Sequence, residues 1–208
     1  MKRIVFLGGS FNPPHIGHQK LLQASAQTVR DVEGVPPDLM LFIPAAHPPH
    51  KAENGMMNTE HRLAMCQLAA AEIGAQVSDI EINRQGKSYT ADTLHALKEQ
   101  YGPDCKLYLT VGSDMLRTLR EWYQADAIFS LATICSNVRA GDDEQEVLRA
   151  KKELEQCGAT VYLIKEPVPE ASSTDIRRRI ASGEPIVGLV PEPVAAYIRK
   201  NQLYRIYQ

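Results

Sequence analysis

Two histidines three residues apart, His15 and His18, are the side chains of this sequence that are best placed for chemistry. They follow Gly8 and Gly9 in the segment GGSFNPPHIGH, directly after a short apolar run. Glycines let the backbone approach a ligand closely, and a helix that starts here directs its N-terminus at the same spot, which favours an anion. Two imidazoles there would supply hydrogen-bond donors for the charge that develops in phosphoryl-type transfer. The same spacing also fits a metal site or two unrelated surface histidines.

A second candidate phosphate contact lies late in the chain, in the segment SSTDIR at 172–177. Ser173 and Thr174 at a helix start would leave backbone N–H groups for an anion, and Arg177 could form a forked contact to a phosphate. The alternative is an ordinary capped helix with a solvent-exposed arginine face at 177–179. The presence of the first segment in the same chain favours the phosphate site.

The elements that must position these residues alternate between strands and helices. Apolar runs predict strands at 3–7, 39–43, 77–82, 106–111, 132–135 and 160–164, and helical patterns cover 18–29, 60–73, 90–101, 144–157, 173–181 and 194–201. The expected N-caps are Thr59, Thr90, Asp142 or Asp143, and Ser172 or Ser173. The order predicts an α/β fold, a Rossmann-like doubly wound parallel sheet. Ligands of such sheets bind at the carboxyl ends of the strands, where the strand order reverses, so we expect the site after Leu7, Ile43 and Val111.

Length allows one compact domain or two small ones, and the span of the two phosphate segments favours a single domain over 1–208, with a late phosphate-binding helix at about 172–182 and a helical tail at about 191–208. The 208 residues are 44% hydrophobic, which excludes disorder, collagen and coiled coil for the whole chain. Lys and Arg (23) nearly balance Asp and Glu (25), which argues against a protein that coats nucleic acid by charge.

The cysteines and the apolar runs indicate where the chain functions. Cys66, Cys105, Cys135 and Cys157 form no CxxC pair, so we expect small apolar residues in a reducing compartment rather than a zinc or redox site. The longest apolar runs are too short to cross a membrane. We therefore expect a cytoplasmic protein with neither a membrane nor a nucleic acid as partner.

The two phosphate segments together resemble the nucleotidyltransferase superfamily. His-Ile-Gly-His after a glycine-rich turn is similar to its (T/H)xxH motif, which holds the triphosphate of a nucleotide, and SSTDIR is similar to the late signature of its adenylyltransferase branch. The related class I aminoacyl-tRNA synthetases would need a KMSKS-like segment, and none is present. Neither GxxxxGK[ST] nor GxGxxG occurs; Gly86-Lys87-Ser88 lacks the leading glycine because position 81 is Glu.

Further segments narrow the resemblance to the bacterial nicotinate mononucleotide adenylyltransferase family. These are PPHK at 48–51, SYTADTL at 88–94, Gly112-Ser113-Asp114, Trp122-Tyr123, and the C-terminal stretch at 191–204. The resemblance implies a nucleotidyltransferase-type fold and transfer of AMP from ATP to nicotinate mononucleotide, which gives deamido-NAD and pyrophosphate. It implies Mg²⁺ that arrives with ATP, with no metal site built from side chains.

The resemblance also implies the residues of the two binding sites. The implied ATP site consists of Gly8, Gly9, Ser10, Phe11, His15, His18, Gly112, Asp114, Ser173, Thr174, Ile176 and Arg177, of which His15, His18 and Arg177 are the catalytic ones. The implied acceptor site consists of Lys51, Thr90, Trp122 and Tyr123, with Trp122 stacked on the pyridine ring and with Thr90 and the backbone near Tyr123 bound to the carboxylate.

Three of these residues also have ordinary structural interpretations. From its type alone, Asp114 could bond a ribose hydroxyl or the adenine edge, or cap a helix. Lys51 could hold a phosphate or contact only water, and Trp122 could be a half-buried packing residue.

Two segments depart from the family pattern. Pro44-Ala45-Ala46-His47 stands where the family often has Asn, and Val138-Arg139-Ala140-Gly141 stands where it has Arg-Pro-Gly. We expect these departures to affect contacts around the substrates and not the reaction class.

Two alternative functions remain open at this stage. One is nucleotidyl transfer to another phosphate acceptor, such as nicotinamide mononucleotide, phosphopantetheine or glycerol phosphate. The other is a catalytically silent relative that senses nucleotides. The segments at 88–94 and 122–123 favour the nicotinate acceptor, and the intact His15, His18 and Arg177 favour an active enzyme.

Overall fold

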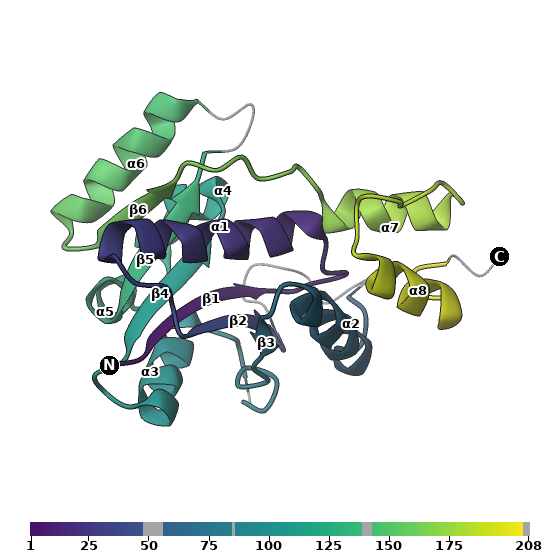
Figure 1. Ribbon diagram of the computed structural model, residues 1–208, viewed down its shortest axis with the longest axis horizontal. Helices are drawn as coiled ribbons and strands as arrows, with labels where there is room; N and C mark the ends of the chain where they lie inside the picture. Colours follow the sequence, from purple (N-terminus) through teal and green to yellow (C-terminus); the bar gives the residue numbers. More distant parts are fainter. Residues whose placement is uncertain (48–55, 85, 139–142, 206–208) are drawn as a thin grey trace.

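The computed structural model describes residues 1–47, 56–84, 86–138 and 143–205 (Figure 1). Its strands form one parallel sheet in the order β3-β2-β1-β4-β5-β6. The strands are β1 (Arg3–Gly9), β2 (Leu39–Pro44), β3 (Gln76–Val77), β4 (Lys106–Val111), β5 (Ala132–Asn137) and β6 (Thr160–Ile164). The expected doubly wound α/β fold is confirmed. The strand order reverses between β1 and β4, so the carboxyl ends of these two strands and of β2 border the expected site.

Helices cover both faces of this sheet. They are α1 (Ile16–Glu33), α2 (Thr59–Glu72), α3 (Thr90–Tyr101), α4 (Ser113–Thr118), the 3₁₀ helix η1 (Leu119–Glu121), α5 (Ala125–Leu131), α6 (Glu144–Gln156), α7 (Ser173–Ala181) and α8 (Glu192–Lys200). Leu22 of α1 and Cys66 of α2 pack on one face, while Leu94 of α3 and Ile128 of α5 pack on the other. Figure 1 shows α1 and α3 on opposite sides of the strands.

A third apolar cluster lies beyond the end of the sheet, among α2, α7 and α8 (Figure 1). Met65 of α2, Ile176 of α7 and Val194 and Ile198 of α8 are buried together there. Burial of apolar area is the main force that holds such helices in place. The cluster therefore fixes α7 against α2, and with it Arg177, the residue that follows Ile176.

The third predicted strand is mostly wrong. Only Gln76–Val77 pairs with β2, and the chain then turns at 80–83, where the amide of Asn83 donates to the carbonyl of Asp79 at 2.9 Å. Within this turn Ile80 packs on the core, and the carboxylate of the buried Glu81 accepts a hydrogen bond of 2.7 Å from the Thr93 hydroxyl. The apolar residues that suggested a strand instead serve the packing of this turn against the core and α3.

Several helix boundaries also differ from the prediction. Asn58, not Thr59, caps α2, because its Oδ1 accepts from the amide of His61 at 2.9 Å. Thr90 is the first residue of α3, after Tyr89 at the cap position. Asp143 caps α6 as expected, and Ser172 occupies the cap position of α7 without a side-chain hydrogen bond.

The short helices α4, η1 and α5 were not predicted, because each is too short for an apolar period to show. All four cysteines are free, and three of them are buried. None of the described helices is both long enough and apolar enough to span a bilayer.

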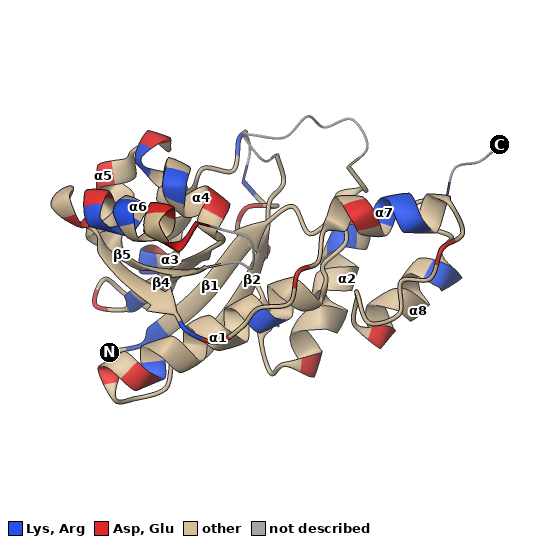
Figure 2. Cartoon of the chain, turned by 90° about the horizontal axis from the view of Figure 1, so that it is seen from above, with Lys and Arg blue, Asp and Glu red and all other residues tan. Residues whose placement is uncertain are grey.

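Charged residues are concentrated away from the middle of the sheet. Figure 2 shows them on the outer helices and loops, with little charge along β1 and β2 and both signs on α7. The site at the ends of β1 and β2 is therefore exposed to a few local cations rather than to a broad basic surface.

Candidate active site

The two histidines of the first segment form a reciprocal cap at the start of α1. His15 is the N-cap residue, and its Nδ1 accepts from the backbone amide of His18 at 3.3 Å. The Nδ1 of His18 in turn accepts from the backbone amide of His15 at 3.1 Å. This is the arrangement of a capping box, with imidazoles in place of the usual hydroxyl and carboxylate. The rings stack with their centroids 3.5 Å apart, so both are held in fixed orientations.

This cap also decides which ring nitrogen carries the proton. An Nδ1 that accepts a hydrogen bond has no proton, so each imidazole carries its proton on Nε2 while the cap is formed. Both rings are then neutral and present one N–H donor each.

The loop before α1 is packed to support His18. Phe11 is buried, and its ring lies edge-on to the rings of His18, at 4.9 Å, and of Phe42, at 5.2 Å. A Cβ on Gly17 would meet the carbonyl of Pro169 at 3.0 Å and the His15 ring at 3.1 Å. A side chain at 17 would therefore force these neighbours to shift. Because the Phe11 ring is buried, Phe11 could serve a ligand only through its backbone.

A cleft of about 480 Å³ lies beside the histidines. It is lined by His15, Gly17, His18, Leu21, Asn137, Val168, Pro169, Glu170, Ala171, Ser172, Asp175 and Leu189. Asn137 at the end of β5 is 2% exposed, and its Oδ1 has no hydrogen-bond partner among the described residues. A buried amide oxygen normally has a partner, so Asn137 is a candidate ligand contact that the sequence did not single out.

The late phosphate segment lies against the first one. The Ser173 hydroxyl donates to the carbonyl of Pro13 at 2.8 Å, and Nη1 of Arg177 donates to the carbonyl of Asn12 at 2.8 Å. Arg177 and Thr174 also line a second cleft of about 670 Å³, which is bordered by the start of α2 and the C-terminal segment. The structure thus brings together the two segments that the sequence paired. The side chain of Ile176 is fully buried, and its amide donates to the carbonyl of Ser172 at 2.9 Å, so the structure does not place this residue as a ligand contact.

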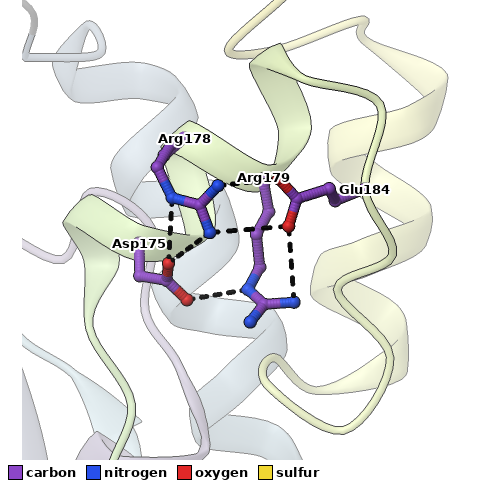
Figure 3. Close-up of polar contacts among 4 residues, drawn as sticks. All are labelled: Asp175, Arg178, Arg179 and Glu184. Atoms are coloured by element: carbon purple, nitrogen blue, oxygen red, sulfur yellow. Dashed lines mark hydrogen bonds and ion pairs between the residues drawn. The ribbon is translucent and has the colours of Figure 1, made fainter.

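The next two arginines of α7 have different partners. Arg178 and Arg179 both bind Asp175, at 2.8 and 2.7 Å, and Arg178 also binds Glu184 at 2.7 Å (Figure 3). These ion pairs lower the pKa of the Asp175 carboxyl, through its hydrogen bonds to Arg179 and then to Arg178. Of the three consecutive arginines, Arg177 is the one that points toward the β1 loop.

Arg62 of α2 is a second cation beneath the loop, and the sequence analysis did not predict it. It is 1% exposed, and its Nη1 donates to the carbonyls of Ser10, at 2.9 Å, and of Ala45, at 2.7 Å. Its Nε donates to the carbonyl of Met57 at 3.0 Å. Burial lowers the pKa of the guanidinium, but an arginine in a protein stays charged.

A sequence signal for Arg62 did exist. The residue stands on the apolar stripe of α2, three, four and seven positions before Met65, Cys66 and Ala69. A charged residue on a core-facing stripe is rarely buried unless it has specific partners.

Thr90 and Tyr123 of the implied acceptor site lie at or beside the start of α3. The Ser88 hydroxyl accepts from the amide of Ala46 at 3.1 Å, which ties the end of β2 to the approach to Thr90. The rings of Tyr89 and Tyr123 lie 4.5 Å apart, which brings the turn at 122–123 beside that helix start. Trp122 is partly buried against the core, and Lys51 lies outside the described residues.

The remaining predicted ATP residues lie at the ends of β1 and β4. Gly8 is exposed, and a Cβ there would meet no atom within 4 Å, which leaves room for a ligand. Gly112 occupies the cap position of α4, and Asp114 lies in its first turn. Since β4 is the direct neighbour of β1, these residues border the same edge of the sheet.

The two departures from the family pattern have different outcomes. Ala45 and Ala46 contribute through the backbone, because the amide of Ala45 donates to the carbonyl of Gly9 at 2.9 Å and that of Ala46 to Ser88. Because the backbone makes these contacts, having Ala where the family often has Asn leaves them unchanged. The other departure, at 139–141, lies outside the described residues.

Acidic and metal-binding side chains do not cluster in the part of the chain that the structure describes. No group of three or more His, Cys, Asp or Glu residues in it could hold a metal ion.

Comparisons with known proteins decide the family. A family model described as cytidylyltransferase-like matches residues 6–179. A protein of Geobacter sulfurreducens named "probable nicotinate-nucleotide adenylyltransferase" is 37% identical over 95% of this chain and 96% of its own length. A protein of the same name from Thermoanaerobacter is 34% identical over 98% of this chain and 94% of its own. The chain belongs to the nicotinate-nucleotide adenylyltransferase family.

Solved structures confirm the fold of this adenylyltransferase. The nicotinic acid mononucleotide adenylyltransferase of Plasmodium falciparum complexed with NaAD has a TM-score of 0.74 at 18% identity, with 98% of each chain covered. The same enzyme complexed with APC has a TM-score of 0.72. At this identity the comparison shows the fold alone.

The role of Arg62 can be tested by removing its charge at similar volume. Arg62→Met leaves the carbonyls of Ser10, Ala45 and Met57 without their donor, so we expect the free energy of unfolding to fall by about 3 kcal/mol. Urea denaturation measures this change.

The matched control is Arg199→Met, which removes an exposed arginine paired with Glu192 and should cost no more than about 0.5 kcal/mol. Equal losses in the two variants would show that Arg62 is not the internal anchor of this loop.

Proposed function

We propose that this chain transfers the adenylyl group of ATP to nicotinate mononucleotide, which gives deamido-NAD and pyrophosphate. One observation carries the proposal: the loop between β1 and α1 contacts both implied half-sites. It binds Arg177 and Ser173 of the late phosphate segment, and Gly9, the last residue of β1 directly before it, accepts from Ala45 of the segment that leads to Ser88 and Thr90. A reaction that joins the phosphates of two substrates needs both binding sites to lie beside the same loop.

The reaction needs alignment and charge stabilisation, and no covalent intermediate. An oxygen of the 5′-phosphate of nicotinate mononucleotide attacks the α-phosphorus of ATP in line, and the bond to the departing pyrophosphate breaks. Nε2–H of His15 and of His18 donates to the phosphate oxygens, and Arg177 neutralises charge on the leaving group. The reciprocal cap supports this role, because it fixes both rings before substrate binds.

Mg²⁺ fits this chemistry as a companion of the nucleotide. Phosphate oxygens and water are the ligands this ion prefers, and it commonly reaches a site with the nucleotide. When bound it neutralises charge on the pyrophosphate.

The cleft beside the histidines is the proposed place for the nucleoside of ATP. Its volume of about 480 Å³ falls in the range of small-molecule pockets. Asn137 offers a buried amide oxygen, which could accept from the amino group of adenine. Asp114 at the neighbouring strand end is the proposed partner of a ribose hydroxyl.

The acceptor half-site is proposed around the first turn of α3. The N-terminus of this helix at Thr90 favours a carboxylate over a neutral carboxamide. Trp122 is the proposed stacking partner of the pyridine ring, and the backbone at Tyr123 a further contact. The ring contact between Tyr89 and Tyr123 supports both roles, because it joins the turn at 122–123 to the start of α3.

Removing one histidine donor should impair turnover. In His18→Ala the reacting phosphates lose a hydrogen-bond donor and His15 loses its capping partner, so we expect kcat to fall by about 10²–10³. A pyrophosphate-release assay with saturating ATP and nicotinate mononucleotide measures it. His95→Ala, an exposed histidine on α3, is the control and should keep kcat within about twofold. Turnover of His18→Ala like that of the control would remove the histidines from the mechanism.

The acceptor can be identified with the same assay on a panel of compounds. Nicotinate mononucleotide should support the fastest pyrophosphate release, ahead of its amide, phosphopantetheine and glycerol phosphate, because the helix N-terminus at Thr90 favours a carboxylate. Release with the amide alone would overturn the nicotinate assignment. If none of these acceptors supports pyrophosphate release, the result would favour a nucleotide-sensing relative.

A further inference from the structure

The C-terminal segment returns to the β1 loop after α8. Tyr204 lies 192 positions beyond Asn12, and its hydroxyl donates to Oδ1 of Asn12 at 2.9 Å. Leu203, the residue before it, is buried in the cluster of α2, α7 and α8, and its amide donates to the carbonyl of Ile198 at 3.1 Å. The segment is thus anchored on its apolar side and delivers one hydroxyl to the loop.

Asn12 connects that hydroxyl to the phosphate-binding arginine. Its side chain is 6% exposed, and its Oδ1 also accepts from the amide of Met57 at 3.2 Å. Its backbone carbonyl accepts from Nη1 of Arg177 at 2.8 Å. The position of this carbonyl therefore depends on the two donors that hold the Asn12 side chain.

The surroundings of Tyr204 keep its hydroxyl a donor. Burial raises the pKa of the phenol, and the nearby charges of Arg177 and Arg62 lower it by less. The backbone of Tyr204 has a φ of 64°, in the left-handed region that a residue with a Cβ adopts at a cost. Such a conformation persists only where surrounding contacts impose it, and here they direct the side chain to Asn12.

We propose that Tyr204 is a positioning residue for ATP, which acts through Asn12 to hold the guanidinium of Arg177 in place for the phosphates. The inference rests on the proposed function, because it assigns Arg177 to ATP. Tyr204 lies on the ATP side of the loop, whereas the acceptor side is joined through Ala45, Ala46 and Ser88. Loss of the hydroxyl should therefore affect ATP and leave nicotinate mononucleotide unaffected.

Tyr204→Phe tests this with the removal of one oxygen atom. We expect the KM for ATP to rise about three- to tenfold, the equivalent of one net hydrogen bond, while the KM for nicotinate mononucleotide changes by less than about twofold. Steady-state pyrophosphate release with each substrate varied in turn measures both constants, and the melting temperature reports the fold.

Tyr197→Phe is the matched control. The hydroxyl of Tyr197 also makes a hydrogen bond of 2.9 Å between α8 and α2, to Nδ1 of His61, away from the β1 loop. Tyr197→Phe should lower the melting temperature about as much as Tyr204→Phe does and leave both KM values unchanged. Equal effects of the two variants on the KM for ATP would overturn the positioning role.

A double-mutant cycle with Arg177→Lys tests the route through Arg177. If Tyr204 acts through this guanidinium, the effect of Tyr204→Phe on the KM for ATP should shrink below about twofold in the Arg177→Lys background. An undiminished effect would overturn the role. A wild-type enzyme that releases no pyrophosphate would overturn the proposed function and, with it, this inference, whereas an active wild type with an unaffected Tyr204→Phe variant overturns the inference alone.

Discussion

The structure depends on how the carbonyl groups of the loop between β1 and α1 are satisfied. A loop that approaches an anion must turn its carbonyl oxygens elsewhere, and buried carbonyls need donors. Four carbonyls, from Gly9 at the end of β1 to Pro13, have donors from three parts of the chain: Gly9 from Ala45 after β2, Ser10 from Arg62 of α2, and Asn12 and Pro13 from Arg177 and Ser173 of α7. Two of these donors are guanidinium groups, so the contacts that shape the loop also place positive charge beside it.

The same loop explains how one site serves two substrates. On one side it meets α7, which the apolar cluster around Ile176 fixes against α2 and α8. On the other side it meets the end of β2, which Ser88 joins to the start of α3. Between them, the reciprocal cap of His15 and His18 holds two N–H donors in fixed directions. The loop is therefore held on both sides by contacts from distant parts of the chain.

The sequence predicts the part of this account that is local or shared with a family. The apolar runs predicted β4 and β6 at their observed bounds, and the parallel sheet followed from their order. The contact between the loop before α1 and the segment around Arg177 was predicted from motif resemblance. The donors Arg62 and Tyr204 were not, because their partners lie far away in the chain and no local period reveals a long-range polar contact. The strand prediction for 77–82 failed for a related reason, since the apolar residues there pack a turn on the core and α3.

The central claim is that the site aligns two phosphates for direct in-line transfer with no nucleophile from the protein. The stereochemical course at the α-phosphorus tests it most directly, with one diastereomer of ATP carrying sulfur at that phosphorus and nicotinate mononucleotide as acceptor. A single in-line displacement predicts inversion of configuration in the deamido-NAD product. Retention would indicate a covalent adenylyl-enzyme and would contradict the account.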